Sequence, residues 1–517
     1  MGLLSKIVFL QLGYIQIFGF GLLFAQTKPN QNTFLEKSVS ISAQNITLDQ
    51  VFDQLSKQCN CYFTYDAVLI NGNKLVTFSS NHLLLKNVLD TLLQNPTFSY
   101  EVINNQVVIH PLKISAVNDS IGYSKYLFVS GTIVNNSNKE PLPFTSIAIK
   151  NNFIGGISNE SGFFSLKIPI SFFYDTLVFS YLGFYNLEMP IRDIPKNGLI
   201  FLSEGQISIQ EIIVRSKDPR LIIRKARESI NSNYRNEAYN YEAFYREAVK
   251  SDNRYSIYSE ALISGYKPSL NTLIDNDKVQ LQKARKFTNI KQTDTLMVKL
   301  RGGMEACFQL DIVHHLPDFL TLEGEKMYAY HLNDMVVWFD ELVYAIGFKQ
   351  LSHISEPMLE GQVYINTTNY AIIGAEFYFA SEKLRQSDKL FVIRKSMQTR
   401  VKPMSAKYMV RYIPIKNKYY VQYVRGELQL HVRKNKQLFN RNFSTMMEMV
   451  YTGNDTLNCE KPLKRDLFQT HSIFSDSEYV YDDDFWKQQN IIQPEENILE
   501  ALKKSGFQLQ QQGVSKE

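Results

Sequence analysis

The chain has 517 residues, of which 44% are hydrophobic and 21% charged, and its formal net charge is +5. This length predicts two to four folded domains. The small net charge, with no long run of Lys and Arg, argues against a nucleic-acid-binding protein. The 34 Phe and 30 Tyr against 2 Trp favour strands, because Phe and Tyr suit pleated, half-buried surfaces.

The N-terminus has the pattern of an export signal. Lys6 supplies a positive charge, an apolar run covers residues 7–24, and small Ala25 ends that run before a polar stretch. This pattern predicts a signal peptide over residues 1–25 with cleavage after Ala25. An uncleaved membrane anchor is the alternative, because the apolar run is long enough to span a bilayer.

The four cysteines fit an oxidising compartment without forming a disulfide framework. Cys59 and Cys61 are separated by one residue, so a disulfide between them would be strained. A bridge between Cys307 and Cys459 stays open. Their spacing is not that of a zinc site, and we interpret all four as packing residues.

Residues 34–112 run twice through the order strand, helix, strand. In the first pass Ser38–Ala43 alternates like a half-buried strand. Thr47 and Gln50 form a capping box at the start of a helix, and Cys61–Tyr65 returns as a strand. The helix has apolar residues at i, i+3, i+4 and i+7, namely Leu48, Val51, Phe52 and Leu55.

The second pass repeats this order. Lys74–Phe78 is a predicted strand, and a helix with the same apolar spacing at Leu85, Val88, Leu89 and Leu92 follows it. Tyr100–Ile103 and Gln106–Ile109 then form a predicted hairpin, since the two Asn residues between them tolerate the positive φ of a tight turn.

This first module resembles the secretin and TonB N-terminus short domain. The likeness is carried by residues 46–66, ITLDQVFDQLSKQCNCYFTYD, which contain the first helix and the strand after it. The resemblance implies a periplasmic domain that docks protein partners.

Residues 126–205 contain short predicted strands separated by turns. The strands are Phe128–Val134, Phe144–Lys150, Phe163–Ile168 and Leu177–Tyr181. Turn signals every 8–12 residues predict an antiparallel β-sandwich. Gly162 permits a left-handed turn, and one of Phe163 and Phe164 should enter the core because strand side chains alternate.

This second module is similar to the carboxypeptidase-regulatory-like domain. The motifs that carry the likeness are Val129–Ile133, Pro141–Pro143, Gly156–Phe164 and Ser180–Phe184, with Ser158-Asn159 in place of the usual Thr-Asp. The resemblance implies a non-catalytic sandwich that accompanies peptidases and receptors, so it transfers no activity to this chain.

Residues 216–470 form a predicted β-rich domain. Asp218 caps a helix that Pro219 opens. Gly361–Asn366 and Tyr370–Phe379 pair as a hairpin, and Glu427–Arg433 alternates with one face inward. The fold class is therefore multidomain α+β and all-β: a small βαβ-repeat domain, an antiparallel β-sandwich and a β-rich antiparallel meander with flanking helices.

Residues 471–517 combine an acidic and aromatic segment with a predicted helix that Pro494 opens. In TonB-dependent receptors the two front modules precede a plug and a membrane barrel. The residues after 205 are too few for that barrel and lack its repeated strands, so we expect a chain of this type without the receptor barrel.

A zinc hydrolase is the sharpest catalytic alternative. His353 and Glu356 have H-x-x-E spacing, and His471 lies where a third ligand could come from. Metallocarboxypeptidases use a mixed, largely parallel α/β fold, and no such alternation of strands and helices occurs here. We interpret these residues, and the pair His314-His315, as loop or surface residues, and predict no catalytic, metal or cofactor site and no cofactor.

Taken together, these features predict an exported, non-enzymatic protein of the periplasm or outer membrane, with a binding or assembly role. An envelope protein is the expected partner, and peripheral association with the outer membrane fits the same pattern. A curved sheet with an aromatic inner face could instead hold a lipid or a glycan. A receptor-like transport or signalling component and a zinc carboxypeptidase-like hydrolase remain the alternatives.

Overall fold

The computed structural model describes most of the chain between residues 35 and 492. The described residues are 35–65, 72–93, 98–103, 106–111, 126–205, 218–252, 254–272, 276–288, 299–300, 303–380, 384, 388–394, 399–434, 441–455, 459–470, 474, 483–486 and 491–492. The expected signal peptide, His471 and the expected C-terminal helix lie outside them. The chain divides into two compact units, residues 1–123 and 124–517.

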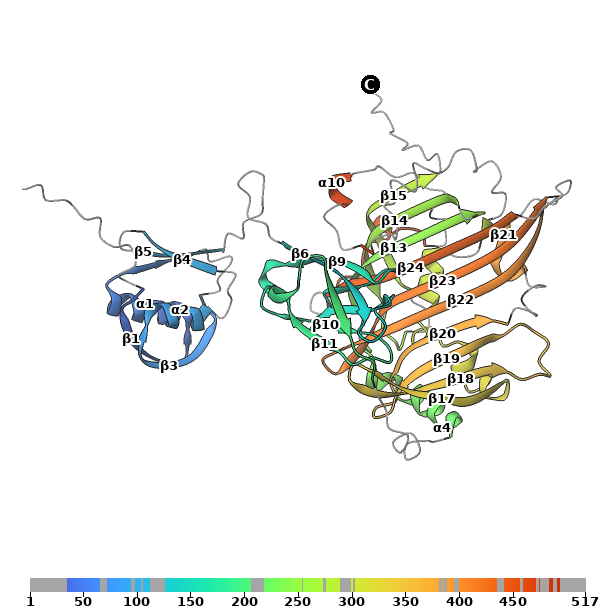
Figure 1. Cartoon of the computed structure of the whole chain (residues 1–517), viewed down its shortest axis with the longest axis horizontal. Coiled ribbons are helices and arrows are strands. Elements are labelled where there is room, and N and C mark those ends of the chain that lie inside the picture. The colour runs from blue at the N-terminus through green and yellow to red at the C-terminus, as the bar shows by residue number, and fades with distance from the viewer. Residues whose placement is uncertain are drawn as a thin grey trace, which may run out of the picture. The chain divides into compact units, whose positions relative to one another are not determined.

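The first unit has the predicted order of elements, coloured blue in Figure 1. Its strands and helices are β1 (Ser38–Thr47), α1 (Leu48–Cys59), β2 (Tyr62–Thr64), β3 (Leu75–Leu84), α2 (Leu85–Leu93), β4 (Phe98–Ile103) and β5 (Gln106–Pro111). The capping box at α1 is confirmed: the Gln50 N–H donates to Thr47 Oγ1 at 3.3 Å, and the Thr47 N–H donates to Gln50 Oε1 at 3.1 Å.

The two passes through this unit contribute to separate sheets. β1 pairs antiparallel with β3, whereas β2 pairs parallel with β5, which also forms a hairpin with β4. Each pass therefore places its first strand in one sheet and its last strand in the other. The apolar faces of both helices pack between these strands in one core, which includes Val51, Leu55, Val88 and Leu89.

The cysteines are free thiols. Cys59, Cys61 and Cys307 are buried, which confirms them as packing residues. Cys459 is exposed, so its interpretation as a packing residue is wrong, and no bridge joins it to Cys307.

Residues 126–205 form the sandwich, the cyan and green domain in Figure 1. One sheet has the order β11-β10-β7-β8 and the other β12-β6-β9. The strands are β6 (Tyr126–Asn135), β7 (Ser146–Ile149), β8 (Gly155–Ile157), β9 (Phe163–Pro169), β10 (Thr176–Ser180), β11 (Leu187–Pro190) and β12 (Gly198–Leu202). The antiparallel prediction fails at one strand, because the chain crosses from β11 to the other sheet, where β12 runs parallel to β6.

Two local predictions for the sandwich are confirmed. Phe164 is only 1% exposed and packs in the sandwich core. Gly162 has a φ of +74°, and a Cβ there would lie 2.4 Å from the Ile133 carbonyl oxygen. A side chain at this turn would therefore be both strained and crowded.

The remainder of the second unit is built on a ten-stranded sheet with the order β15-β14-β13-β24-β23-β22-β20-β19-β18-β17. All neighbouring strands in it are antiparallel. The strands are β13 (Tyr239–Ser251), β14 (Arg254–Lys267), β15 (Lys278–Thr288), β17 (Tyr328–Trp338), β18 (Glu341–Gln350), β19 (Leu359–Asn366), β20 (Ile372–Phe379), β22 (Thr399–Ile415), β23 (Lys418–Lys434) and β24 (Arg441–Asp455). A separate pair joins β16 (Lys299–Leu300) to β21 (Val392–Arg394).

The predicted meander is confirmed from β17 to β24, with the hairpin of β19 and β20 in place. The first three strands of the domain, β13, β14 and β15, extend the sheet on the far side of its last strand, because β13 pairs with β24. The body is thus mostly β-structure with few helices, as the strand-rich composition indicated.

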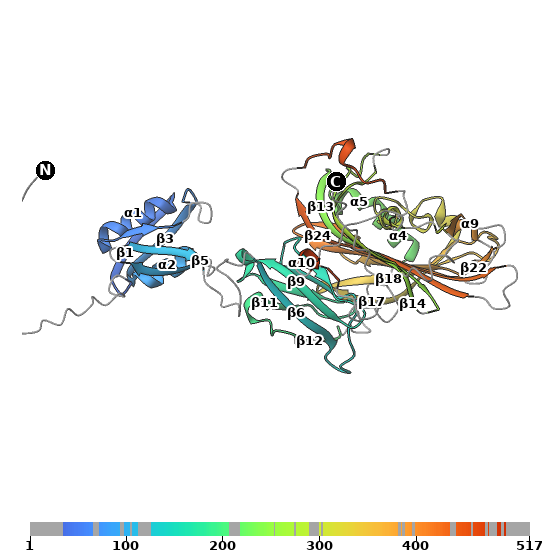
Figure 2. The same ribbon diagram turned by 90° about the horizontal axis from the view of Figure 1, so that it is seen from above.

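The helices lie mainly against one face of the large sheet. They are α4 (Pro219–Glu228), α5 (Ile230–Asn233), α7 (Met304–Gln309), α9 (Asp388–Phe391) and α10 (Asp483–Trp486). Figure 2 shows α4 and α5 over one face and the sandwich strands β6 and β9 on the other. We call these faces the helix side and the sandwich side.

The N-terminus of α4 forms as predicted, because the Asp218 side chain accepts from the Arg220 N–H at 3.0 Å and Pro219 occupies the first turn. Its buried residues Ile222, Ile223 and Ala226 pack into the main core of the body. No helix in the described part of the chain has the length and apolar character needed to cross a membrane.

The sandwich is attached to the large sheet through specific contacts. The Gly183 N–H donates to the Val337 carbonyl oxygen at 2.8 Å, and the Asn186 N–H donates to Asp340 Oδ1 at 2.9 Å. Ile157 of the sandwich packs with Tyr423 and Trp486 in a small buried cluster. The sandwich and the β-rich body therefore form one compact unit.

Candidate binding groove

Three transverse rows of side chains cross the sandwich side of the sheet. Residues paired directly across antiparallel strands point to the same face of the sheet, so the strand register shows which side chains form each row. The first row is Glu360, Tyr378, Lys407 and Glu427; the second is Gln362, Glu376, Met409 and Arg425; the third is Tyr364, Gly374, Arg411 and Tyr423. All three rows run from β19 to β23.

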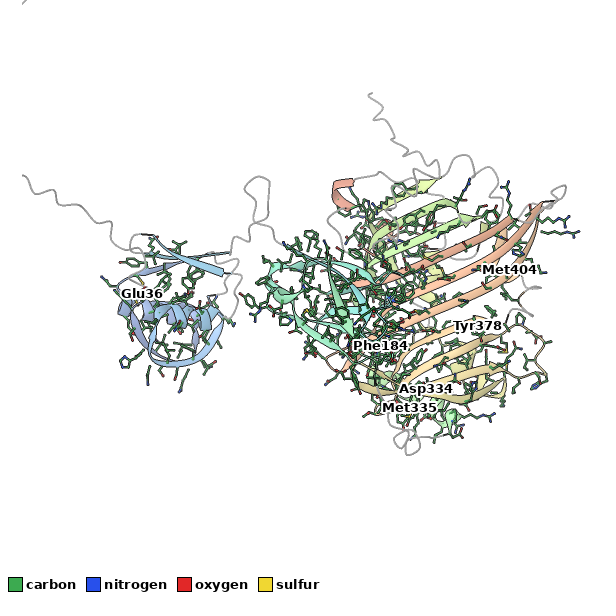
Figure 3. The ribbon with its side chains drawn as sticks, in the orientation of Figure 1. Glu36, Phe184, Asp334, Met335, Tyr378 and Met404 are labelled. Carbon is green, nitrogen blue, oxygen red and sulfur yellow. The ribbon has the colours of Figure 1, made fainter. Side chains whose placement is uncertain are left out.

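The first two rows, together with Tyr364 of the third, form the floor of a groove of about 600 Å³, which also receives Phe144 from the sandwich. In the view of Figure 3, Tyr378 lies beside the sandwich rather than beneath it. The groove falls within the range of about 300–1,000 Å³ that is usual for small-molecule sites. We call it the groove below.

Charges of both signs line the groove in equal number. Lys349, Lys407 and Arg425 are positive, and Glu360, Glu376 and Glu427 are negative. Arg425 pairs with Glu427 at 2.7 Å, and Glu376 pairs with Arg411.

The remaining three charges of the groove have no such partner. Glu360, Lys349 and Lys407 make no hydrogen bond or ion pair with any residue that the structure describes. Glu360 is only 7% exposed as a residue, so most of its surface is covered while its side chain makes no such contact with a described residue.

At one end of the groove, Gly347 on β18 lets two side chains of β17 cross its backbone. A Cβ on Gly347 would lie 2.5 Å from His331 Nε2 and 2.7 Å from Asn333 Nδ2. The two side chains therefore lie across the Gly347 backbone. Asn333 Nδ2 also donates to Gln362 Oε1 at 3.0 Å, which places an amide pair on the groove wall.

Phe144 forms the wall on the sandwich side, in a backbone conformation that is unusual for a bulky residue. Its φ is +58°, and its N–H donates to the Ser158 carbonyl oxygen at 3.1 Å. Its ring stacks on Tyr423 with centroids 5.7 Å apart, and the Arg425 guanidinium lies 4.9 Å from the ring centre. Left-handed backbone at a large residue is strained, and such strain is concentrated at functional sites.

Behind the groove, the second row continues as a buried series of alternating charges. Arg425 pairs with Glu448 at 3.2 Å, and Glu448 pairs with Arg246 at 2.9 Å. Arg246 and Arg285 then share Glu260, at 2.8 and 2.5 Å. The series crosses β23, β24, β13, β14 and β15 in direct register.

Neighbouring groups satisfy the carboxylates of this series. Tyr258 donates to Glu260 and Tyr423 donates to Glu448, both at 2.7 Å. Burial disfavours the ionised form of Glu260, but the charges of Arg285 and Arg246 outweigh burial and lower the pKa of this carboxyl. Trp486 covers the far end, with the Arg285 guanidinium 4.4 Å from its ring centre.

A second charged cluster lies buried at the helix side. Lys267 Nζ is 2.7 Å from Asp311 Oδ2 and 3.5 Å from Asp277 Oδ2. Tyr412 donates to Asp311 Oδ1 at 2.7 Å. Burial opposes ionisation of Asp311, but the charges of Lys267 and His314 outweigh it and hold the pKa of the carboxyl well below its usual range.

Of the residues considered as metal ligands, His353 and Glu356 lie in the part of the chain that the structure describes and His471 does not. His353 and Glu356 are exposed in the turn between β18 and β19, where Glu356 accepts from Ser355 Oγ at 3.1 Å. Among the described residues, no three His, Cys, Asp or Glu side chains converge on a site that could hold a metal ion.

The sequence predicts a loop or surface residue at His314, but its side chain is largely buried and contacts Asp311. Its side chain is 13% exposed, and Nδ1 lies 2.9 Å from Asp311 Oδ2. Burial lowers the pKa of the neighbouring His315. The pair thus belongs to the edge of the Lys267 cluster, which sequence reasoning did not find because its members come from β14, the residues before β15 and the loop after α7.

Part of the aromatic content of the body forms the core on the helix side. Phe319 stacks on Phe348 with centroids 3.9 Å apart, and both are buried with the residues of α4 in the same core. The groove residues were missed as a site. In the sequence these residues are the polar positions of alternating strands. Such positions are interpreted as solvent-exposed surface unless the order of the strands is known.

Comparison with known proteins identifies one segment of the chain. The model of the CarboxypepD_reg-like domain matches residues 129–214, which confirms the resemblance of the second module. No curated protein matches the sequence.

Solved structures show a weak likeness over about half of the chain. A domain described as an outer membrane lipoprotein-sorting protein from Vibrio parahaemolyticus is 8% identical, with 47% of this chain and 96% of that chain covered and a TM-score of 0.22. A DUF1329 family protein from Desulfovibrio piger is 12% identical, with 46% and 94% covered and a TM-score of 0.19. A LolA superfamily protein from Nitrosomonas europaea is 12% identical, with 46% and 94% covered and a TM-score of 0.16. At these values the likeness carries no weight for function.

Proposed function

We propose that the chain is a non-enzymatic binding protein of the cell envelope and that the groove is its ligand site. The observation that carries this proposal is the groove itself: a hollow of about 600 Å³ on the ten-stranded sheet, with Phe144 of the sandwich as a wall. Sites built on strands hold their side chains more accurately than sites on loops.

The other parts of the chain have supporting roles in this proposal. Residues 1–25 direct export, so the protein works in the periplasm or at the outer membrane. Residues 34–112 dock an envelope protein partner, in keeping with the resemblance of this module. Residues 126–205 form the wall of the groove, and the β-rich body of residues 216–470 supplies its floor.

The proposal is tested by thermal unfolding of the full chain with three classes of compound: oligosaccharide mixtures, short peptides and phospholipid vesicles. A ligand that binds the native state raises the melting temperature by mass action. We expect one class to do so for the wild type and not for the double variant Tyr378→Ala, Lys407→Ala. Tyr174→Ala is the matched control, because Tyr174 is 39% exposed on the sandwich and does not line the groove.

Two results would contradict the proposal. The first is stabilisation that persists in the double variant, which would move the binding site elsewhere. The second is chemical change in the bound compound, read as an altered mass after incubation, which would make the protein an enzyme.

A further inference from the structure

We propose that the ligand of the groove is a neutral oligosaccharide, an inference that rests on the proposed function. The first reason is the arrangement around Tyr378. Its side chain is 46% exposed and stands between Glu360 and Lys407 in the same transverse row. An exposed aromatic ring flanked by one acceptor and one donor matches a sugar ring, which has an apolar C–H face and hydroxyl groups at its edge.

The second reason is Glu360. The residue is only 7% exposed, lines the groove and makes no hydrogen bond or ion pair with a described residue. Burying a charged group without hydrogen bonds is unfavourable. A pair of neighbouring sugar hydroxyls would donate to its two oxygens, and the nearby Asn333–Gln362 amide pair offers further donors and acceptors.

The third reason is the balance of charge. Three basic and three acidic side chains line the groove, so its lining as a whole attracts neither anions nor cations over a long range. A phosphorylated headgroup would require an excess of basic groups. An acyl chain would bury Glu360, Lys349 and Lys407 against hydrocarbon, which is costly for unpaired charges.

The fourth reason concerns peptides. An extended peptide gains affinity by pairing its backbone with the free edge of a sheet. The groove lies over the face of the sheet, where β19, β20, β22 and β23 are already hydrogen-bonded to neighbours on both sides. Recognition there depends on side chains, which favours a compact ligand rich in hydroxyl groups over an extended chain.

The experiment measures binding of the full chain to a panel of neutral tri- to pentasaccharides by isothermal titration calorimetry. Uronic-acid oligosaccharides, short peptides and anionic phospholipid vesicles form the comparison arms. We expect at least one neutral oligosaccharide to bind, with an affinity that changes little between low and high salt because the ligand carries no charge.

Variants connect that binding to the groove. Tyr378→Ala should weaken binding about tenfold, since the stacking partner is lost. Glu360→Leu should weaken it by a similar factor, whereas Glu360→Gln should retain most of it because a neutral hydroxyl needs an acceptor and not a charge. Tyr174→Ala should bind as the wild type does, and circular dichroism checks that each variant is folded.

The outcomes separate this inference from the proposed function. Binding of peptides or vesicles in a Tyr378-dependent manner, without binding of neutral oligosaccharides, overturns the ligand class and leaves the groove as a binding site. Oligosaccharide binding that Tyr378→Ala does not change overturns the inference. No Tyr378-dependent binding in any arm overturns both.

Discussion

The two faces of the ten-stranded sheet hold their charges in different ways. On the helix side Lys267, Asp311 and Asp277 form one closed cluster at the edge of an apolar core. On the sandwich side charges alternate across the strands, from buried Arg285 at one end to the open groove at the other. In the helix-side cluster the charged groups pair with one another. In the groove Glu360, Lys349 and Lys407 pair with no residue of the described part of the chain, and a ligand could supply the missing partners.

The largest effect is expected from breaking the closed cluster. Lys267→Met would leave Asp277 buried without its cation and Asp311 with only His314 beside it. Removing one partner of a buried ion pair costs about 3–5 kcal/mol. Urea unfolding followed by tryptophan fluorescence measures this loss, because both Trp residues of the chain, Trp338 and Trp486, lie in the second unit.

The control for this variant is Lys196→Met, at an exposed lysine of the sandwich, which should change stability by less than about 0.5 kcal/mol.

The loss of stability at low pH, the acid limb of the stability curve, gives a second check. Because the pKa of Asp311 is held well below its usual range, its contribution is present above about pH 4 and is lost as the pH falls through the folded-state pKa. Lys267→Met should flatten that acid dependence; an unchanged acid limb would contradict the assigned pairing.

A smaller effect is expected on the sandwich side. Arg246→Met removes the central cation of the alternating series, but Glu260 keeps Arg285 and Glu448 keeps Arg425. The expected loss in the free energy of unfolding is about 2 kcal/mol, the scale of hydrogen bonds to charged groups. If the loss equals that of Lys267→Met in the same urea titration, the shared-partner account of the series is wrong.

The wall of the groove offers a third, opposite test. Phe144 has a left-handed backbone, which costs a side-chain-bearing residue about 1–2 kcal/mol. Phe144→Gly should therefore be more stable than Phe144→Ala by about 1 kcal/mol, although both lose the ring contacts with Tyr423 and Arg425. At an ordinary strand position an Ala variant is more stable than a Gly variant. If Phe144→Ala had the higher melting temperature, no backbone strain would be stored at Phe144.

Much of the fold could be predicted from local patterns. The Thr47–Gln50 capping box, the Asp218 cap and the alternation of Leu428, Leu430 and Val432 are properties of neighbouring residues, and each has the predicted structure. Strand order is not a local property. The pairing of β13 with β24 joins residues about 200 positions apart, and nothing in either strand specifies the other.

The site depended on that missing information. Glu360, Tyr378 and Lys407 come from three strands, and each follows an ordinary pattern of polar residues facing solvent. Their proximity arises from register across the sheet. Phe144 adds a residue from another domain, and its positive φ could not be read from the sequence because no glycine or asparagine marks the position.

The smallest expected effect on stability concerns the residue expected to matter most for binding. Tyr378 is 46% exposed, so Tyr378→Ala should change the free energy of unfolding by less than about 0.5 kcal/mol. Tyr364, in the third row, is 7% exposed and lies 5.3 Å below the Arg411 guanidinium, so Tyr364→Ala should cost about 3 kcal/mol. Urea titration of both variants compares two tyrosines of one groove. If Tyr378→Ala proved as destabilising as Tyr364→Ala, Tyr378 would be a structural residue, and its exposed ring could no longer be explained by a ligand.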